Sequence, residues 1–175
     1  PMVRTYDEAA RPDTLILPDL TPVDAVASRA EAIEDAICDA CLSIARLQLM
    51  EGSPVRLILG GSAPREIEGM NAADAPAIAD ALAAARFDSD EPYDRALTEA
   101  TRRLDRTGAI VLVTGRLTLR VADCAIRLRQ MSNTGVALIW ITDSGRADAE
   151  RLMARLEMAD IIARRDNPFR TEEQE

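Results

Sequence analysis

An aspartate and a threonine follow the first apolar run of the chain. Residues 14–17 (TLIL) are apolar or β-branched, and Asp19 and Thr21 come directly after them, ahead of a long helical pattern. A carboxylate and a hydroxyl at the end of a buried strand offer the oxygen ligands that hard cations such as Mg²⁺ require. The spacing therefore raises the question of whether the chain holds a metal ion or keeps only the outline of such a site.

Other residue types that usually carry chemistry are scarce. The sequence has no histidine and no lysine, so it lacks the usual general base near neutral pH and the commonest metal ligand. Cys38 and Cys41 form a C-x-x-C pair inside a long helical pattern, whereas redox pairs usually lie at a helix N-terminus, which lowers the thiol pKa. We interpret both, and Cys124, as small residues that face the core.

Length and composition are those of one globular domain. The chain has 175 residues, of which 47% are hydrophobic and 29% charged. Its net charge of −9 argues against a nucleic-acid surface, which needs clustered positive charge. No apolar run approaches the roughly 20 residues that span a bilayer, so we expect no membrane contact by this segment itself. Because the first residue is Pro1, we expect the chain to be part of a longer protein.

The first half of the chain predicts a strand, a helix and a hairpin. Strands are expected at 14–18 and 55–59, and the Gly-Gly turn after the second predicts an antiparallel return strand at 65–68. A helix over about 26–50 should bury one face, formed by Ile33, Ile37, Ala40, Ile44 and Leu47. A second helix is expected at 75–86, with Asp74 as its cap.

The second half predicts strands that alternate with helices. The runs AIVLV (109–113) and VALIWIT (136–142) lack polar alternation, as is typical of parallel strands buried on both faces. One helix should carry the stripe Tyr93, Leu97, Ala100 and Leu104, and another the stripe Val121, Cys124, Leu128 and Met131. A last helix should follow the turn DSGRAD (143–148), which supplies capping residues. A short edge strand is expected at 161–163. The order indicates an α/β fold with a mostly parallel sheet, covered on both faces, whose middle strands contain 15–17 and 111–113.

Two stretches make the resemblance to a known family specific. The segment MVRTYDEAARPDTLILPDL, followed by a long helix and GSPVRLILGG, is similar to the C-terminal half of the bacterial domain of unknown function 58 family. AIVLVTGR and TGVALIWITD resemble the later strands of that family. The resemblance implies a three-layer von Willebrand factor A-like, Rossmann-like fold over residues 13–166, after a leading extended segment (1–12) and before an acidic tail (167–175).

The resemblance also implies a metal-ion-dependent adhesion site, which this sequence keeps only in part. Asp19 and Thr21 match the first acidic and hydroxyl positions, but Val23 replaces the second hydroxyl. The middle loop (88–90) has no threonine, and Gly115 stands where the second aspartate would be. We therefore expect no cofactor and no tight metal, with Asp19 and Thr21 as weak candidates for Mg²⁺.

Arg116 leaves two alternatives open. Its guanidinium could balance the charge of Asp19 without a cation, because arginine and carboxylate pair bidentately. Alternatively, Arg116 points to solvent. Residues from these loops form our candidate partner-binding crevice: Asp19, Thr21, Asp24, Ser89, Asp90 and Arg116.

The function that this pattern favours is a non-enzymatic protein-interaction domain. Members of the resembled family are commonly linked to MoxR-type AAA+ ATPases, so such an ATPase is the expected partner, and the expected place is the cytoplasmic part of a membrane-anchored bacterial protein. One alternative is a Rossmann-type enzyme that handles a small molecule or nucleotide, although the first strand-to-helix turn, PDLTPVD, has no glycine. A purely structural domain is another.

Overall fold

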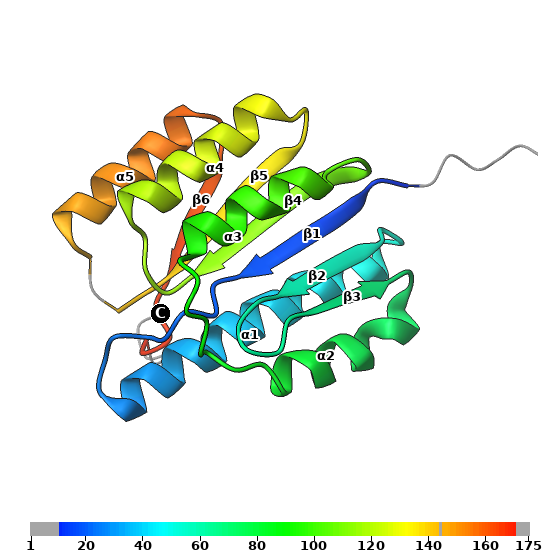
Figure 1. Cartoon of the computed structure of the whole chain (residues 1–175), viewed down its shortest axis with the longest axis horizontal. Coiled ribbons are helices and arrows are strands. Elements are labelled where there is room, and N and C mark those ends of the chain that lie inside the picture. The colour runs from blue at the N-terminus through cyan, green and yellow to red at the C-terminus, as the bar shows by residue number, and fades with distance from the viewer. Residues whose placement is uncertain (1–10, 144, 171–175) are drawn as a thin grey trace, which may run out of the picture.

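The computed structural model describes residues 11–143 and 145–170 and contains one six-stranded sheet between two helical layers (Figure 1). Residues 1–10 of the predicted leading segment and the end of the acidic tail lie outside the described residues. The strands are β1 (Asp13–Pro18), β2 (Val55–Leu59), β3 (Arg65–Gly69), β4 (Thr107–Thr114), β5 (Gly135–Ile141) and β6 (Ile162–Asp166). The α-helices are α1 (Ala27–Met50), α2 (Ala75–Ala83), α3 (Tyr93–Ala100), α4 (Leu119–Met131) and α5 (Ala147–Met158).

The sheet confirms the predicted topology. Its order is β3-β2-β1-β4-β5-β6, so β1 and β4 occupy the centre. They pair in parallel, with Leu15 opposite Ile110 and Leu17 opposite Leu112. β2 and β3 form the predicted antiparallel hairpin, in which Leu57 lies opposite Ile67. The fold is therefore α/β, mostly parallel, with one antiparallel edge strand.

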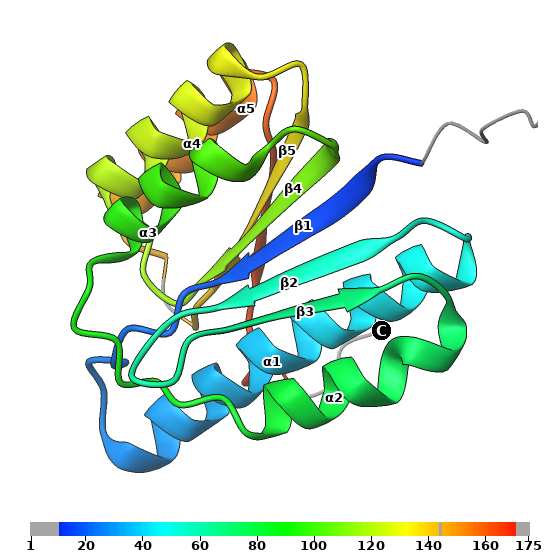
Figure 2. The same cartoon turned by 45° about the vertical axis from the view of Figure 1, so that its right-hand side comes forward.

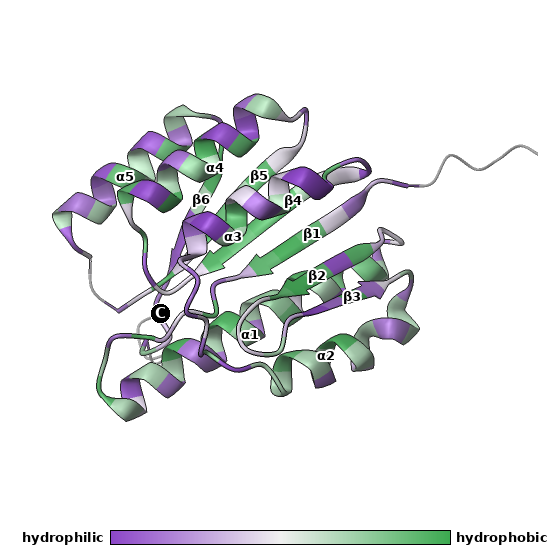
Figure 3. Cartoon of the chain, viewed as in Figure 1, coloured by the Kyte–Doolittle hydropathy of each residue, from purple (hydrophilic) through white to green (hydrophobic). Residues whose placement is uncertain are grey.

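Alternating side chains of the strands build two cores. In Figure 2, α1 and α2 cover one face of the sheet, and α3, α4 and α5 cover the other. Leu15 and Leu17 of β1 point toward the three-helix side, whereas Ile16 points toward α1 and α2. Burial on both faces accounts for the continuous hydrophobic colour of β1 and β4 in Figure 3, because neither face of these strands meets water.

Helix α1 buries a slightly different face from the predicted one. The buried residues Ile33, Ile37, Cys41, Ala45 and Leu49 recur at steps of four. The predicted Leu47 is instead 55% exposed. A step of four rotates the stripe slowly around the helix, so the last turn presents Leu49 to the sheet. Cys41 is fully buried, which confirms the interpretation of this thiol as a core residue.

Three details of the predicted helices were wrong. α2 stops at Ala83 rather than residue 86, and Asp74 makes no side-chain cap to it. The Asp74 carboxylate instead accepts hydrogen bonds from the backbone N–H groups of Met70 and Asn71, in a capping box of the short 3-10 helix Ala72–Asp74. Met131, predicted to face the core from α4, is 73% exposed because the helix ends there.

The edge strand at the C-terminal end is longer than predicted. β6 pairs in parallel with β5 from Ile162 to Asp166, so it ends three residues past the predicted end at residue 163. Its charged residues Arg164 and Arg165 are exposed, as is common for sheet edges that avoid further pairing.

In the described part of the chain, no helix combines the length and apolar character that crossing a membrane requires.

Candidate functional site

A crevice of about 680 Å³ lies at the C-terminal ends of the central strands. The chain leaves β1 toward α1 on one face and leaves β4 toward α4 on the other, so the strand order reverses between them. Open α/β sheets bind ligands at such a point because the diverging loops leave a hollow. The lining includes Asp19, Thr21 and Asp24 from the loop after β1, and Arg116 from the loop after β4.

Asp19 forms the floor of this crevice and is only 4% exposed. Its Oδ1 accepts hydrogen bonds from the Thr21 hydroxyl (2.7 Å) and the Thr21 backbone N–H (3.0 Å). Its Oδ2 accepts a hydrogen bond of 2.6 Å from the hydroxyl of Thr114, the last residue of β4. Both carboxylate oxygens are therefore satisfied within the protein, as the burial of a charged group requires.

The same threonine fixes the loop that follows β4. The backbone N–H of Arg116 donates to Thr114 Oγ1 over 3.0 Å. Asp19, Thr114 and the Arg116 backbone thus form one continuous hydrogen-bonded path across the two central strands. We call these three residues the polar latch, because they hold the loops after β1 and β4 in one arrangement.

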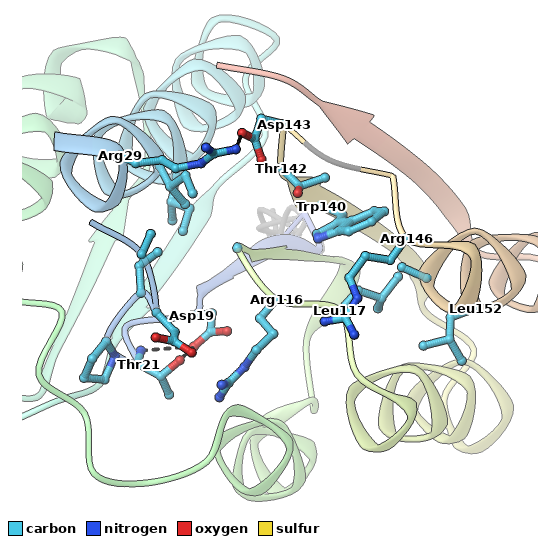
Figure 4. A pocket seen from close by; sticks show the side chains of 18 of the residues that line it. Asp19, Thr21, Arg29, Arg116, Leu117, Trp140, Thr142, Asp143, Arg146 and Leu152 are labelled. Carbon is cyan, nitrogen blue, oxygen red and sulfur yellow. Dashed lines mark hydrogen bonds and ion pairs between the residues drawn. The ribbon is translucent and has the colours of Figure 1, made fainter. Parts of the chain in front are cut away.

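The side chain of Arg116 does not pair with Asp19. Its guanidinium is exposed, and no hydrogen bond or ion pair of that group occurs among residues 11–143 and 145–170. Figure 4 marks no interaction between it and the Asp19 carboxylate. Of the two predicted alternatives, the structure has the one in which Arg116 reaches solvent, because hydroxyl groups already meet the charge of Asp19.

Further side chains close the crevice from β5 and α5. Trp140 of β5 is 4% exposed and forms part of the wall, and Arg146 stands at the start of α5 (Figure 4). Arg29 of α1 forms an ion pair with Asp143 at the opposite rim. Arg29 also lies over the ring of Phe169, with 5.5 Å to its centroid, so the segment after β6 is tied to the beginning of α1.

Neither predicted residue of the loop between α2 and α3, Ser89 or Asp90, lines this crevice. The Asp88 carboxylate instead accepts hydrogen bonds from the Ser62 hydroxyl (2.5 Å) and N–H (3.1 Å) in the hairpin turn. Those hydrogen bonds hold the pKa of Asp88 below its ordinary value. Ser89 lines a neighbouring hollow, and Asp90 is exposed and lines neither.

The neighbouring hollow has about 380 Å³ and lies between β1, β2 and α3. Its wall is mainly apolar, with Leu17, Ile58 and Leu97, and Asp19 and Thr21 line both hollows. The turn after β1 is therefore a ridge between a crevice with a mixed polar and apolar lining and a more apolar hollow. The Tyr93 hydroxyl, on the α3 side, donates to the Leu17 carbonyl, and burial raises its pKa well above the ordinary value. The phenol remains a neutral donor that fastens α3 to β1.

No protein-family model and no curated protein matches the chain. Solved structures do match. The VWA domain of SpRpn10 aligns with a TM-score of 0.61 at 15% identity, over 92% of this chain and 90% of that one. The pilus adhesin SpaC from Lactobacillus rhamnosus GG, in its open conformation, aligns with a TM-score of 0.56 at 15% identity, over 92% of this chain and 28% of the adhesin. The chain has a von Willebrand factor A fold. The polar latch contains Asp19, the first ligand that the family resemblance implies for a metal-ion-dependent site.

The residues around Asp19 do not fit a divalent cation. Mg²⁺ requires about six oxygen ligands in near-octahedral geometry. Here Asp19 and Thr21 are the retained candidates, and they are engaged with each other and with Thr114. Val23 packs against the α1 core instead of offering a hydroxyl. The part of the chain that the structure describes contains no group of three or more acidic or cysteine side chains that could hold a metal.

Gly115 shows why the second carboxylate cannot simply be added to this VWA fold. A Cβ atom at Gly115 would lie 3.0 Å from Ile33 Cγ2 and 3.6 Å from Ile37 Cδ1. The first of these distances is too short for an ordinary carbon contact, so α1 packs where the side chain would begin. α1 therefore packs closely against Gly115, in the space that a side chain at this position would need.

Several residues that shape the crevice were missed in the sequence. Thr114 carried a signal, because a polar residue ends an otherwise apolar central strand. Arg146 and Asp143 lie in the turn DSGRAD, for which the sequence predicted only a helix-capping role. Trp140 belongs to the run VALIWIT, which was predicted to be a buried strand, and it is both core and crevice wall.

The cysteine pair offers no second chemical site. Cys38 is half-buried, and burial, with the charge of Asp35 adding to it, raises its thiol pKa to about 11. Burial also raises the pKa of Cys41. Because the thiolate is the reactive form, both thiols remain unreactive at neutral pH.

Proposed function

We propose that this chain is a non-enzymatic protein-interaction domain whose partner binds across the ridge formed by Asp19 and Thr21. The observation that carries the proposal is the pair of hollows on the two sides of this ridge, one lined about equally by polar and apolar groups and one lined mainly by apolar groups. A surface that joins an apolar pocket to a polar rim suits a protein partner. The VWA fold supports the same reading, since one similar structure belongs to a protein named as a pilus adhesin.

The resemblance to the domain of unknown function 58 family suggests the partner. We propose a MoxR-type AAA+ ATPase, or the complex on which it acts, and a place in the cytoplasmic part of a membrane-anchored bacterial protein. An enzyme of Rossmann type is disfavoured by the loop after β1, where phosphate binding would need a glycine-rich turn before α1. Hydrogen bonds from Thr21 and Thr114 also engage both oxygens of Asp19, so this carboxylate is not a free general base.

Binding of a purified MoxR-type ATPase from the same genome to the immobilised chain tests this proposal. Val26 lines the crevice and is 72% exposed, so Val26→Arg obstructs it without disturbing the core. Met158→Arg is the matched control, because Met158 is 89% exposed and lines neither hollow. We expect Val26→Arg to abolish binding and Met158→Arg to retain it. Equal binding by both variants, or no binding by the wild type, would contradict the proposal.

A further inference from the structure

The crevice contains two arginines whose charges have no partner in the described part of the chain. Arg116 and Arg146 both line it, and neither guanidinium has a hydrogen bond or ion pair within residues 11–143 and 145–170. They come from the loops after two adjacent strands, β4 and β5. In Figure 4 both extend from these loops on the side of the crevice away from Arg29.

The acidic groups of the crevice differ in whether they have partners. Asp19 is held by the polar latch, and Asp143 is paired with Arg29. The carboxylates of Asp24 and Asp148 are exposed at the rim and have no partner in the described part of the chain.

The backbone near Arg146 adds to the attraction for an anion. Arg146 is the N-cap of α5 and makes no side-chain cap, so it leaves the first N–H groups of this 12-residue helix without that acceptor. Ala149, in the first turn, lines the crevice. Exposed N–H groups at a helix start favour negative charge, and guanidinium groups bind carboxylates with two hydrogen bonds.

We infer that the crevice accepts an acidic side chain of the protein partner, which Arg116 and Arg146 bind directly, without a bridging cation. The inference rests on the proposed function and specifies the chemistry of its partner. The polar latch contributes by fixing the backbone of Arg116, since that N–H is bound to Thr114. Asp24 and Asp148 limit the affinity by repelling the same carboxylate.

The single tryptophan of the chain, Trp140, lies in the crevice wall and reports its occupancy by fluorescence. The probe is a short synthetic peptide of alternating glutamate and glycine, compared with a glutamine version of the same length. We expect the glutamate peptide to change the fluorescence saturably and the glutamine peptide to have no effect. Arg116→Gln and Arg146→Gln should each weaken the binding about tenfold, the value of one charge-assisted contact.

Two further variants test the direction of the charge effect and its specificity for the crevice. Asp148→Asn should strengthen the binding of the glutamate peptide, because it removes a competing carboxylate. Arg127→Gln removes an exposed arginine of α4 that lines neither hollow and should leave the binding unchanged. A wild type that ignores the glutamate peptide, or equal effects of Arg127→Gln and Arg116→Gln, would overturn the inference. If the ATPase bound normally to Arg116→Gln and Arg146→Gln but not to Val26→Arg, the proposed function would stand and this inference would fall.

Discussion

Thr114 donates a 2.6 Å hydrogen bond to the Asp19 carboxylate and so joins the ends of the two central strands, β1 and β4. Both residues are buried, at 0% and 4% exposure. Hydroxyl groups hold the loops after these strands together, and Thr114 is the residue on which this arrangement depends.

Replacing Thr114 by valine should destabilise the domain. Valine keeps the shape but leaves Asp19 Oδ2 without its donor, which should lower the free energy of unfolding by about 2 kcal/mol. Urea unfolding followed by circular dichroism measures the change. Thr98→Val is the control, because the Thr98 hydroxyl is exposed and bonds only within α3 and to the Cys124 sulfur beside it. Equal stability of wild type and Thr114→Val would contradict the polar latch.

Gly115→Ala should be destabilising through one contact with α1. The new Cβ would lie 3.0 Å from Ile33 Cγ2, so we expect a loss of about 1 kcal/mol in the free energy of unfolding. Ile33→Ala removes that methyl group. The loss caused by Gly115→Ala should therefore be smaller in the Ile33→Ala background than in the wild type, in a double-mutant cycle. Additive losses would show that the two residues are not coupled.

The sheet topology was predictable because its determinants are local. The uniform apolar runs of β1 and β4 identify central strands, and the Gly60–Gly61 turn identifies the hairpin. The crevice was less predictable because its residues meet only in three dimensions. Ser89 and Asp90 have suitable types, but the hairpin turn binds Asp88 and holds their loop away from the crevice.

Arg56 should be a main determinant of stability at the opposite end of the sheet. Its side chain is 13% exposed, lies 3.1 Å from Asp13 Oδ2 and donates to Thr107 Oγ1. Arg56→Met leaves these groups unpaired, and we expect a loss of about 2 kcal/mol in the free energy of unfolding. Arg65→Met, an exposed site on the adjacent strand β3, is the control and should change stability little. Comparable losses in the two variants would argue against a specific role for Arg56.

Asp88 should make stability depend on pH in the acidic range. The hydrogen bonds from Ser62 lower its pKa from 3.8 in the folded state, so its contribution is present above that value and is lost as pH falls through the folded pKa. Asp88→Asn should therefore melt at a lower temperature than wild type at neutral pH. This difference should close as the wild-type carboxyl is protonated. A melting difference that is constant between neutral and strongly acidic pH would contradict this assignment.

Calorimetric titration of Mg²⁺ and Mn²⁺ into the wild type and Asp19→Ala tests the central claim, that hydroxyl groups rather than a cation satisfy Asp19. The crevice offers too few free oxygen ligands, so any bound ion would keep water in most positions and bind weakly. We predict no binding at micromolar concentration to either protein. Micromolar affinity in the wild type that disappears in Asp19→Ala would contradict the account.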